Sequence, residues 1–415
     1  MLFTYASADY YLEDGAKLGF LITQVVFKSG GAGEGFRRFQ LGEKKFLKVL
    51  KAHDLVSVQP FEGAANKTAA IILKKGEKTE YPVPYIVWNK KKGVGKIATD
   101  RLLDEVLPLL QKNHYIAKPI GTKVGTWQTT PRGLENLSKI EGKNFYKAIL
   151  GIYSTPYGVF WLKIKQVLSD GNLIINNLSE EGKIKVEGVE EIIEPKFIYP
   201  IIRGSDIKRW GFKIAVYMLV VQDPKTKRGY DENFIKNNYP RTYNYLLRFK
   251  DILLKRALYI KYHKDAKAAF YSQFNVSEET FFRYRVAWKL MTNDLIATIV
   301  SQFNTPFGFK DVVPGGTTTF ISTNNESEAH YLCAIINSKP VGDFIKSFSS
   351  AGRGFGTPSV MEHVGIPKFD LKNPLHQKLS EISKKCHHLK LEGKEKEIEI
   401  LEKENDKLVK QLFNT

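Results

Sequence analysis

Cysteine is scarce in this chain, and apolar runs long enough to span a membrane are absent. Its 415 residues include only Cys333 and Cys386. Two cysteines exclude a disulfide framework and a cysteine-rich zinc site, and they are typical of a reducing compartment. The longest apolar runs, such as 214–221, have the length of a strand. The first residues also lack the basic segment of a signal peptide. We therefore expect a cytoplasmic protein without a membrane partner.

Motifs that hold phosphates, metals or reacting groups are missing as well. The glycine-rich stretches 30–35 and 352–356 do not have the Gly-x-Gly-x-x-Gly spacing, and no Gly-Lys pair is followed by Ser or Thr as in a P-loop. His387 and His388 are adjacent on an expected helix beside Cys386, and adjacent helical side chains point apart. The eight histidines form no recognisable catalytic triad. The sequence thus predicts no catalytic residue and no metal ligand.

Positive charge is what the chain has in excess. Lys and Arg outnumber Asp and Glu by 63 to 44, a net charge of +19. Hydrophobic residues make up 43% and aromatic residues 12%, enough for the cores of two or three domains. An excess of cations on this scale favours a polyanionic partner, with nucleic acid before a membrane surface. A generally basic proteome or a solubility effect would produce the same balance.

One stretch, 198–210, joins an apolar run directly to cationic and aromatic side chains. The run ends at Gly204, and Arg203, Lys208, Arg209 and Trp210 lie around it. Guanidinium, ammonium and indole groups grip phosphates and stack on bases, so these four residues are candidate DNA contacts. Arg353, in the glycine-rich loop 349–358, is a fifth candidate. The alternative is a strand, a turn and an exposed basic corner without a ligand.

Four regions follow from the pattern along the chain. Residues 1–90 predict a mostly parallel α/β sheet, with a helix over 36–51 and strands at 18–22, 55–58 and 68–73. Residues 91–125 are rich in Lys and Gly and predict a linker with a short helix. Residues 126–370 alternate short strands with basic helices. Residues 371–415 have heptad spacing, with Asn405 inside the seam, and predict an antiparallel helical hairpin or a dimerising coiled coil.

Several of these segments resemble one family, the adenine-specific N6 DNA methyltransferases of type II restriction–modification systems that fuse the methylase to a target-recognition domain. Residues 14–22, 35–39 and 60–68 resemble the last part of the catalytic domain, and 197–210, 239–256 and 328–369 resemble the recognition domain. The resemblance implies an α/β and α+β fold class: the C-terminal part of a Rossmann-like methyltransferase sheet, a mixed α+β recognition domain and a helical tail. It also implies that Phe61 contacts an adenine flipped out of the duplex.

The chain departs from this family where the chemistry would be. Members carry Asn/Asp-Pro-Pro-Tyr/Phe, whereas no two of the 17 prolines here are adjacent. Thr155-Pro156-Tyr157-Gly158 and Thr305-Pro306-Phe307-Gly308 lack the second proline and are expected to be turns. The S-adenosylmethionine motif should precede the catalytic loop, so the chain is expected to be a C-terminal half that is inactive alone.

The partners implied are double-stranded DNA and the missing methylase half or a separate methylase or restriction subunit. S-adenosylmethionine is expected for the complete enzyme only, and no metal is expected. The alternative is a non-catalytic DNA specificity subunit that works with a separate methylase chain. A third interpretation is an RNA-binding or generic basic scaffold, which no RNA-module motif supports.

Overall fold

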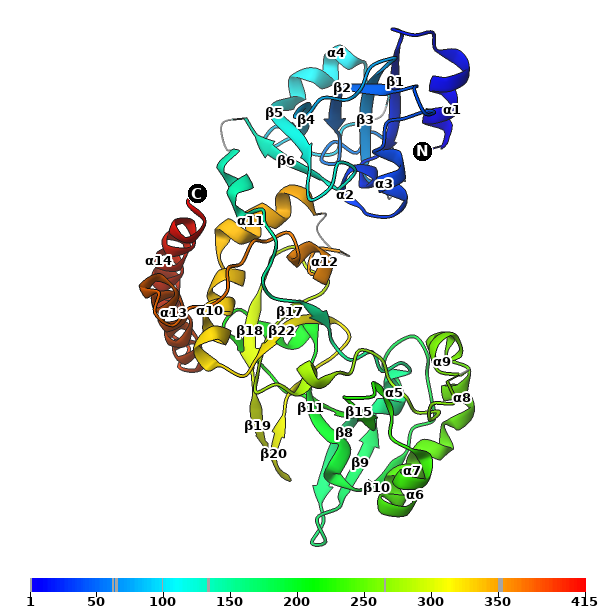
Figure 1. The fold of residues 1–415 in the computed structure, drawn as a ribbon, viewed down its shortest axis with the longest axis vertical. Coiled ribbons are helices and arrows are strands. Elements are labelled where there is room, and N and C mark those ends of the chain that lie inside the picture. Colours follow the sequence, from blue (N-terminus) through cyan, green and yellow to red (C-terminus); the bar gives the residue numbers. More distant parts are fainter. Residues whose placement is uncertain are drawn as a thin grey trace. The chain divides into compact units, whose positions relative to one another are not determined.

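The computed structural model describes residues 2–61, 63, 66–98, 100–132, 135–264, 266–349 and 354–415. The chain divides into two compact units. The first contains Met1–Gly142, Asp343–Ala351 and Thr415, and the second contains Lys143–Gly342 and Gly352–Asn414. Figure 1 labels their helices and strands. No helix of the described part is both long and apolar enough to cross a membrane.

The first unit is built on a six-stranded sheet with the order β1-β3-β2-β4-β5-β6. Its elements in chain order are α1 (Leu2–Tyr11), β1 (Lys17–Thr23), α2 (Val25–Lys28), α3 (Ala32–Phe36), β2 (Leu47–Asp54), β3 (Thr68–Lys75), β4 (Val83–Lys90), α4 (Leu103–Val106), η1 (Leu107–Leu109), β5 (Leu110–Pro119), β6 (Trp127–Pro131) and η2 (Glu135–Ile140). Only the β2–β4 pair of this sheet is parallel. The expected mostly parallel sheet is therefore wrong: the strands that follow one another in the chain, β2 and β3, β4 and β5, and β5 and β6, pair directly as antiparallel neighbours without a crossover helix.

Trp127 lies at the centre of this unit's core. Its ring is fully buried and stacks on Phe27 with centroids 4.4 Å apart, while its Nε1 donates a hydrogen bond to the Tyr81 hydroxyl at 3.2 Å. Residues 343–351 return to this unit, where the Ser347 carbonyl accepts hydrogen bonds from Lys28 Nζ and Thr129 Oγ1. Strand β6 and Trp127 thus belong to the first sheet, and the first unit extends to Gly142.

Two predicted elements of this unit are wrong. No helix follows Phe36, where α3 ends, and the second half of the segment expected to be helical is the strand β2, which begins at Leu47. The buried positions of β2 include Leu47, Val49 and Ala52, and a bulge lies between the last two. The strand expected at 55–58 is a turn in which Asp54 Oδ1 accepts a hydrogen bond from the Val56 amide. The expected linker also differs, because residues 110–117 of β5 pair with the whole of β4.

The second unit contains two sheets and three short ribbons. One sheet has the order β10-β9-β8-β14-β11-β21 and the other β18-β17-β22-β7, and β12–β13, β15–β16 and β19–β20 form the ribbons. The strands are β7 (Ile149–Leu150), β8 (Trp161–Val167), β9 (Leu173–Asn177), β10 (Glu190–Ile193), β11 (Ile198–Ile202), β12 (Ile207–Lys208), β13 (Gly211–Phe212), β14 (Val216–Leu219), β15 (Gln222–Asp223), β16 (Arg228–Gly229), β17 (Tyr284–Lys289), β18 (Ala297–Val300), β19 (Gln302–Thr305), β20 (Gly308–Asp311), β21 (Val313–Pro314) and β22 (Thr318–Thr323).

Helices cover both sheets of this unit. They are α5 (Tyr157–Phe160), η3 (Pro195–Phe197), η4 (Gly204–Asp206), α6 (Glu232–Asn238), α7 (Pro240–Arg248), α8 (Lys250–Leu254), α9 (Ala257–Tyr262), η5 (Glu278–Phe281), α10 (Glu326–Ile336), α12 (Pro358–Met361), α13 (Pro374–Leu391) and α14 (Glu395–Phe413), and α11 (Lys339–Phe348) begins in this unit. Residues 329–336 of α10 are all buried, because α10 lies between the second sheet and α13 (Figure 1).

Helices α13 and α14 pack against each other as a hairpin that turns at Gly393, where φ is +74°. Asn405, the polar residue in the heptad seam, is buried, and its Nδ2 donates a hydrogen bond to the Ala334 carbonyl of α10 at 2.8 Å. This contact gives the asparagine a partner within the chain, so its place in the seam needs no second copy.

Candidate nucleic-acid interface

The corner after β11 is fixed by an ion pair within itself. The Arg203 guanidinium contacts both carboxylate oxygens of Asp206, with Nε–Oδ2 at 2.7 Å and Nη2–Oδ1 at 2.9 Å. Asp206 Oδ2 also accepts a hydrogen bond from the Arg203 amide. A bidentate pair of this kind holds a guanidinium in one orientation. Arg203 therefore shapes the turn η4, and this pair occupies two of its donors.

Arg209 and Trp210 fix the helical hairpin to the second sheet. Arg209 Nη1 donates a hydrogen bond to the Asn337 carbonyl at 3.1 Å and lies 3.6 Å from the Glu402 carboxylate. Trp210 is 2% exposed, and its Nε1 donates to Glu402 Oε1 at 2.7 Å. Its ring also meets His387 edge to face. The expectation that Trp210 contacts DNA is corrected here, because a buried indole with a satisfied N–H cannot stack on a base.

Lys208 is the cation of this stretch that remains exposed. It sits opposite Gly211 in the β12–β13 ribbon, and its ammonium has no ion pair or hydrogen bond within the described residues. The chain thus uses three of the four candidates from 203–210 to build a rigid corner and leaves one ammonium on its surface.

Of the two remaining candidate contacts, the structure describes Phe61 but not Arg353. Phe61 lies in the connection between β2 and β3 of the first unit, and 49% of its side chain is exposed. An exposed phenyl ring on a loop is available for stacking, although its neighbours Glu62, Ala64 and Ala65 lie outside the described residues. Arg353 also lies outside the described residues, so the structure places no contact for it.

The first unit carries an aromatic and basic group that the sequence pattern did not reveal. Trp88 Nε1 donates a hydrogen bond to His53 Nδ1 at 3.0 Å, and the Lys112 ammonium lies 5.9 Å from the Trp88 ring centre. Burial and the charges of Lys51 and Lys112 lower the pKa of His53. Trp88 on β4 and Lys112 on β5 are directly opposite each other. Lys112 lies in the segment 91–125 that was expected to be a linker, so the alternation of side chains along a strand was not recognised there.

The two segments expected to be proline turns differ in the second unit. Pro306 and Phe307 form the turn of the β19–β20 ribbon, whereas Tyr157 and Gly158 of the other segment begin helix α5, so the turn expected there is wrong beyond Pro156. Beside that ribbon turn, Phe309 is 72% exposed. Its exposure could not be seen in the sequence because Phe303 and Phe307, in the same segment, pack against the unit's two cores.

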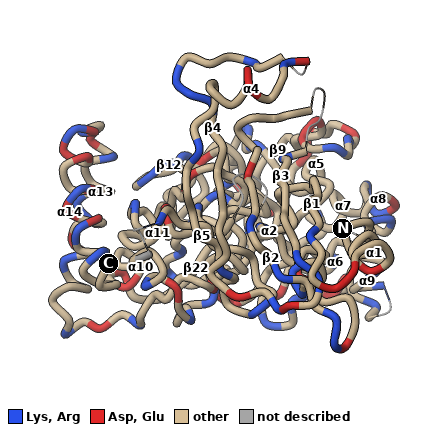
Figure 2. Tube along the Cα trace, turned by 90° about the horizontal axis from the view of Figure 1, so that it is seen from above, with Lys and Arg blue, Asp and Glu red and all other residues tan. Residues whose placement is uncertain are grey.

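Lysine and arginine are spread over both units (Figure 2). In the second unit, Lys225, Lys227 and Arg228 occupy the exposed β15–β16 turn. Further exposed cations follow on α7, α8's C-terminal end and α9, namely Arg241, Lys255 and Lys261. Surface cations arranged in this way attract a polyanion without specifying its sequence.

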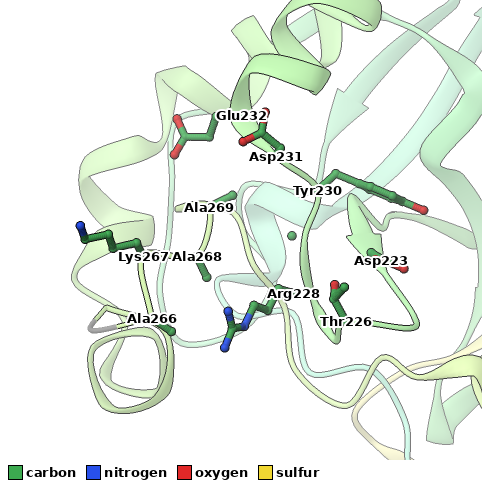
Figure 3. Close-up of a pocket in the computed structure, with 11 residues that line it drawn as sticks. Asp223, Thr226, Arg228, Tyr230, Asp231, Glu232, Ala266, Lys267, Ala268 and Ala269 are labelled. Atoms are coloured by element: carbon green, nitrogen blue, oxygen red, sulfur yellow. The ribbon is translucent and has the colours of Figure 1, made fainter.

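A pocket of about 450 Å³ lies beside this turn (Figure 3). Its charged lining residues are the acids Asp223, Asp231 and Glu232 and the bases Arg228 and Lys267. Asp231 accepts the Phe234 amide as the N-cap of α6, and Asp223 accepts the Lys225 amide, so these carboxylates already have partners. Three carboxylates against two cations leave the lining slightly negative, so its charge does not exclude the sulfonium of S-adenosylmethionine. Nothing else in the lining identifies it as the site of that cofactor.

The glycine-rich stretch 30–35 does not fit the cofactor. It contains helix α3, and a Cβ at Gly33 would lie 2.7 Å from Arg37 Nη1 and 3.1 Å from the Val26 carbonyl oxygen. Gly33 is thus required by close packing inside the first unit. Within the described residues, no cluster of three or more His, Cys, Asp or Glu side chains could hold a metal ion.

Comparison with known proteins bears on the family. No protein-family model matches the chain. Over 289 residues it is 22% identical to the type II methyltransferase M.MjaIV of Methanocaldococcus jannaschii, an alignment that covers 65% of this chain and 90% of that protein. The chain is related to restriction–modification methyltransferases. This confirms the resemblance read from the sequence.

A solved structure supports the fold. The type IIL restriction–modification enzyme MmeI, whose structure is a complex with DNA, matches 99% of this chain with a TM-score of 0.57 and 12% sequence identity. The present chain spans about half of the MmeI chain, 49%. The mixed α/β and α+β fold class expected for the present chain is confirmed. The parallel sheet expected for its first unit is not.

Proposed function

We propose that this chain is the DNA-recognition part of an S-adenosylmethionine-dependent adenine-N6 methyltransferase of a restriction–modification system. The relation to M.MjaIV over 65% of the chain carries this proposal. The net charge of +19 and the exposed cations of both units support a duplex DNA partner. On this proposal the chain clamps the duplex and reads its sequence, while methyl transfer takes place in the complete enzyme.

Four described side chains are assigned to this interface. Lys208 contacts a phosphate, because its ammonium is exposed on a corner that Arg203 and Arg209 hold rigid. Trp88, with Lys112 over its ring, offers a second contact surface on the first unit. Phe61 is assigned to the flipped adenine, because it is a half-exposed ring on a loop. Arg353 keeps its assignment as a DNA contact on the sequence alone.

The chain is proposed to be inactive alone. The tandem-proline catalytic motif is absent from its sequence. We therefore assign the cofactor and the reacting groups to the complete enzyme and derive no chemical step through this chain.

The methylase partner is proposed to bind at the N-terminal edge of the first sheet. Strand β1 pairs with β3 on one side and is the edge of the sheet on the other. Large apolar side chains gather beside it, with Leu21 on β1 54% exposed and Phe3 and Tyr10 on α1 at least 80% exposed. An open edge with exposed apolar neighbours accepts a further strand. A methylase domain that supplies such a strand would extend this sheet.

A second candidate is a non-catalytic specificity subunit with a separate methylase chain. The exposed apolar side chains Leu391 and Ile400 on the α13–α14 hairpin favour it, since a helical hairpin of this kind can dock on another subunit. The two candidates differ in where the partner binds. Alanine or lysine substitutions at Leu21 disrupt the first complex, and substitutions at Ile400 disrupt the second.

The experiment that tests the proposed function combines methyl transfer with binding. The chain alone is incubated with tritium-labelled S-adenosylmethionine and mixed-sequence duplex DNA. We expect no incorporation, but duplex binding that weakens steeply with salt. Sequence-dependent incorporation would overturn the proposed incompleteness. Absence of duplex binding at low salt would overturn the recognition role.

A further inference from the structure

The β19–β20 ribbon of the second unit has two chemically different faces. Cross-strand pairs are Gln302 with Asp311, Phe303 with Lys310 and Asn304 with Phe309. Because side chains alternate along a strand and directly opposed residues share a face, Gln302, Asn304, Phe309 and Asp311 lie on one face and Phe303 and Lys310 on the other. The two faces therefore have to be considered separately.

The inner face anchors the ribbon. Phe303 packs against the smaller core of the unit, and Phe307 in the turn lies 5.7 Å from the Tyr217 ring. Lys310 Nζ donates hydrogen bonds to the carbonyls of Pro195 and Lys196, at 2.9 and 3.1 Å. These contacts hold one side of the ribbon. On the opposite side, Asp311 at the base of the ribbon lies 3.5 Å from Arg285 Nη1, and its side chain is 27% exposed.

Beyond Asp311, the outer face presents two amides and one aromatic ring. Gln302 and Asn304 are exposed, and their side-chain amides make no hydrogen bond within the part of the chain that the structure describes. Phe309, directly opposite Asn304, is 72% exposed. Figure 1 shows the ribbon extending from the end of β18. The two amides and the ring are open to solvent and are cross-strand neighbours, so all three can contact one ligand together.

The chemistry of this face matches that of one kind of base pair. The major groove of B-DNA admits a two-stranded ribbon. There, a carboxamide forms two hydrogen bonds with adenine N6 and N7, and an apolar side chain contacts the thymine methyl group. Lys196, exposed at the base of the ribbon, is placed to contact a neighbouring phosphate. No guanidinium, the usual partner of guanine, lies on this face.

We infer that the outer face of the β19–β20 ribbon enters the major groove and reads A·T base pairs through Gln302, Asn304 and Phe309. This inference rests on the proposed function and adds to it the residues that set the sequence preference. The amides select adenine, and Phe309 selects the thymine methyl group. A rigid inner face supports this selection because it fixes the distance between the amides.

The test is selection of bound sequences from a randomised duplex library by the full chain, followed by sequencing. Wild type is compared with Asn304→Ala, Gln302→Ala and Phe309→Ala, and Asn244→Ala, an exposed asparagine on α7, is the matched control. We expect each ribbon variant to lose about 5- to 150-fold of its preference for A·T at one position, while the rest of the selected sequence is unchanged. The control keeps the wild-type sequence.

A gain of preference gives a second readout. Arg bonds guanine O6 and N7, so Asn304→Arg is expected to shift the affected position toward G·C. Unchanged selected sequences in all ribbon variants would overturn the inference and leave the proposed function standing. If wild type binds no duplex, the proposed function and the inference both fail. Melting midpoints equal to wild type confirm that the variants are folded, as expected for side chains outside the cores.

Discussion

Trp210 and Lys208 are two residues apart in the sequence but have opposite roles in the structure, so substitution should separate them. Trp210 is 2% exposed and contacts His387 and Glu402 of the helical hairpin. Removing a buried indole costs about 3–5 kcal/mol. For a unit of this size each kcal/mol lowers the melting midpoint by about 2–4 °C. Trp210→Ala should therefore lower it by roughly 6–20 °C.

Trp210→Phe isolates the hydrogen bond from the packing. The phenyl ring retains most of the buried area, but Glu402 Oε1 loses the indole donor at 2.7 Å. A hydrogen bond to a charged group contributes about 1.5–3 kcal/mol, so we expect a loss of about 2 kcal/mol in the free energy of unfolding. Combining Trp210→Phe with Glu402→Gln in a double-mutant cycle should give a coupling of about 1–2 kcal/mol.

Lys208→Ala is the matched surface variant. Its exposed ammonium has no partner in the described part of the chain, so the free energy of unfolding should change by less than about 0.5 kcal/mol. Duplex affinity should fall, and the slope of log affinity against log salt should decrease by about 1. The assays are calorimetric melting and fluorescence titration with duplex DNA. If Trp210→Ala melts like wild type but loses DNA affinity, the assignment of Trp210 to the hairpin contact is refuted.

Three further predictions concern buried groups of the second unit. Burial lowers the pKa of His387 to about 4 and of His330 to about 3, so the folded state binds fewer protons than the unfolded state below pH 6.5. The free energy of unfolding, measured in urea, should therefore fall by about 2 kcal/mol per histidine from pH 6.5 to 5 and should be constant above pH 7.5. A free energy of unfolding that does not change between pH 6.5 and 5 would contradict this. Burial raises the pKa of Cys386 to about 12 and that of Cys333 further, so a thiol reagent at pH 8 should modify neither in the folded chain and both after unfolding. Asp206→Asn should cost about 2 kcal/mol, because it leaves a mostly buried guanidinium without its carboxylate; an unchanged urea midpoint would exclude that role.

The sequence predicted elements where local pattern and tertiary structure agree. The strands at 18–22 and 68–73 and the helices of 371–415 are apolar in the period that their element requires, and the structure contains them. The helix expected over 36–51 is wrong because Phe39, Phe46 and Leu50 imitate helical spacing, although the first two precede the bulged strand β2 and only Leu50 lies in it. Strand β5 was hidden by the lysines around it, which are common in linkers as well as on exposed strands.

The candidate interface was predictable in type but not in detail. A sequence shows that Arg203, Arg209 and Trp210 could bind a polyanion, but it does not show that Asp206 and Glu402 occupy them. Glu402 lies 192 residues from Trp210, and such a contact leaves no local signal. Conversely, Phe309 looked like any core aromatic, and only the register of the ribbon placed it on the exposed face.

Titration of the wild-type chain with duplex DNA over a series of salt concentrations tests the recognition role most directly. With six phosphate contacts, affinity should fall by about 10³-fold between 50 and 200 mM salt, and duplex DNA should compete better than single-stranded RNA of equal length. Weak binding to duplex at the lowest salt, or equal competition by RNA, would contradict a role in recognising DNA.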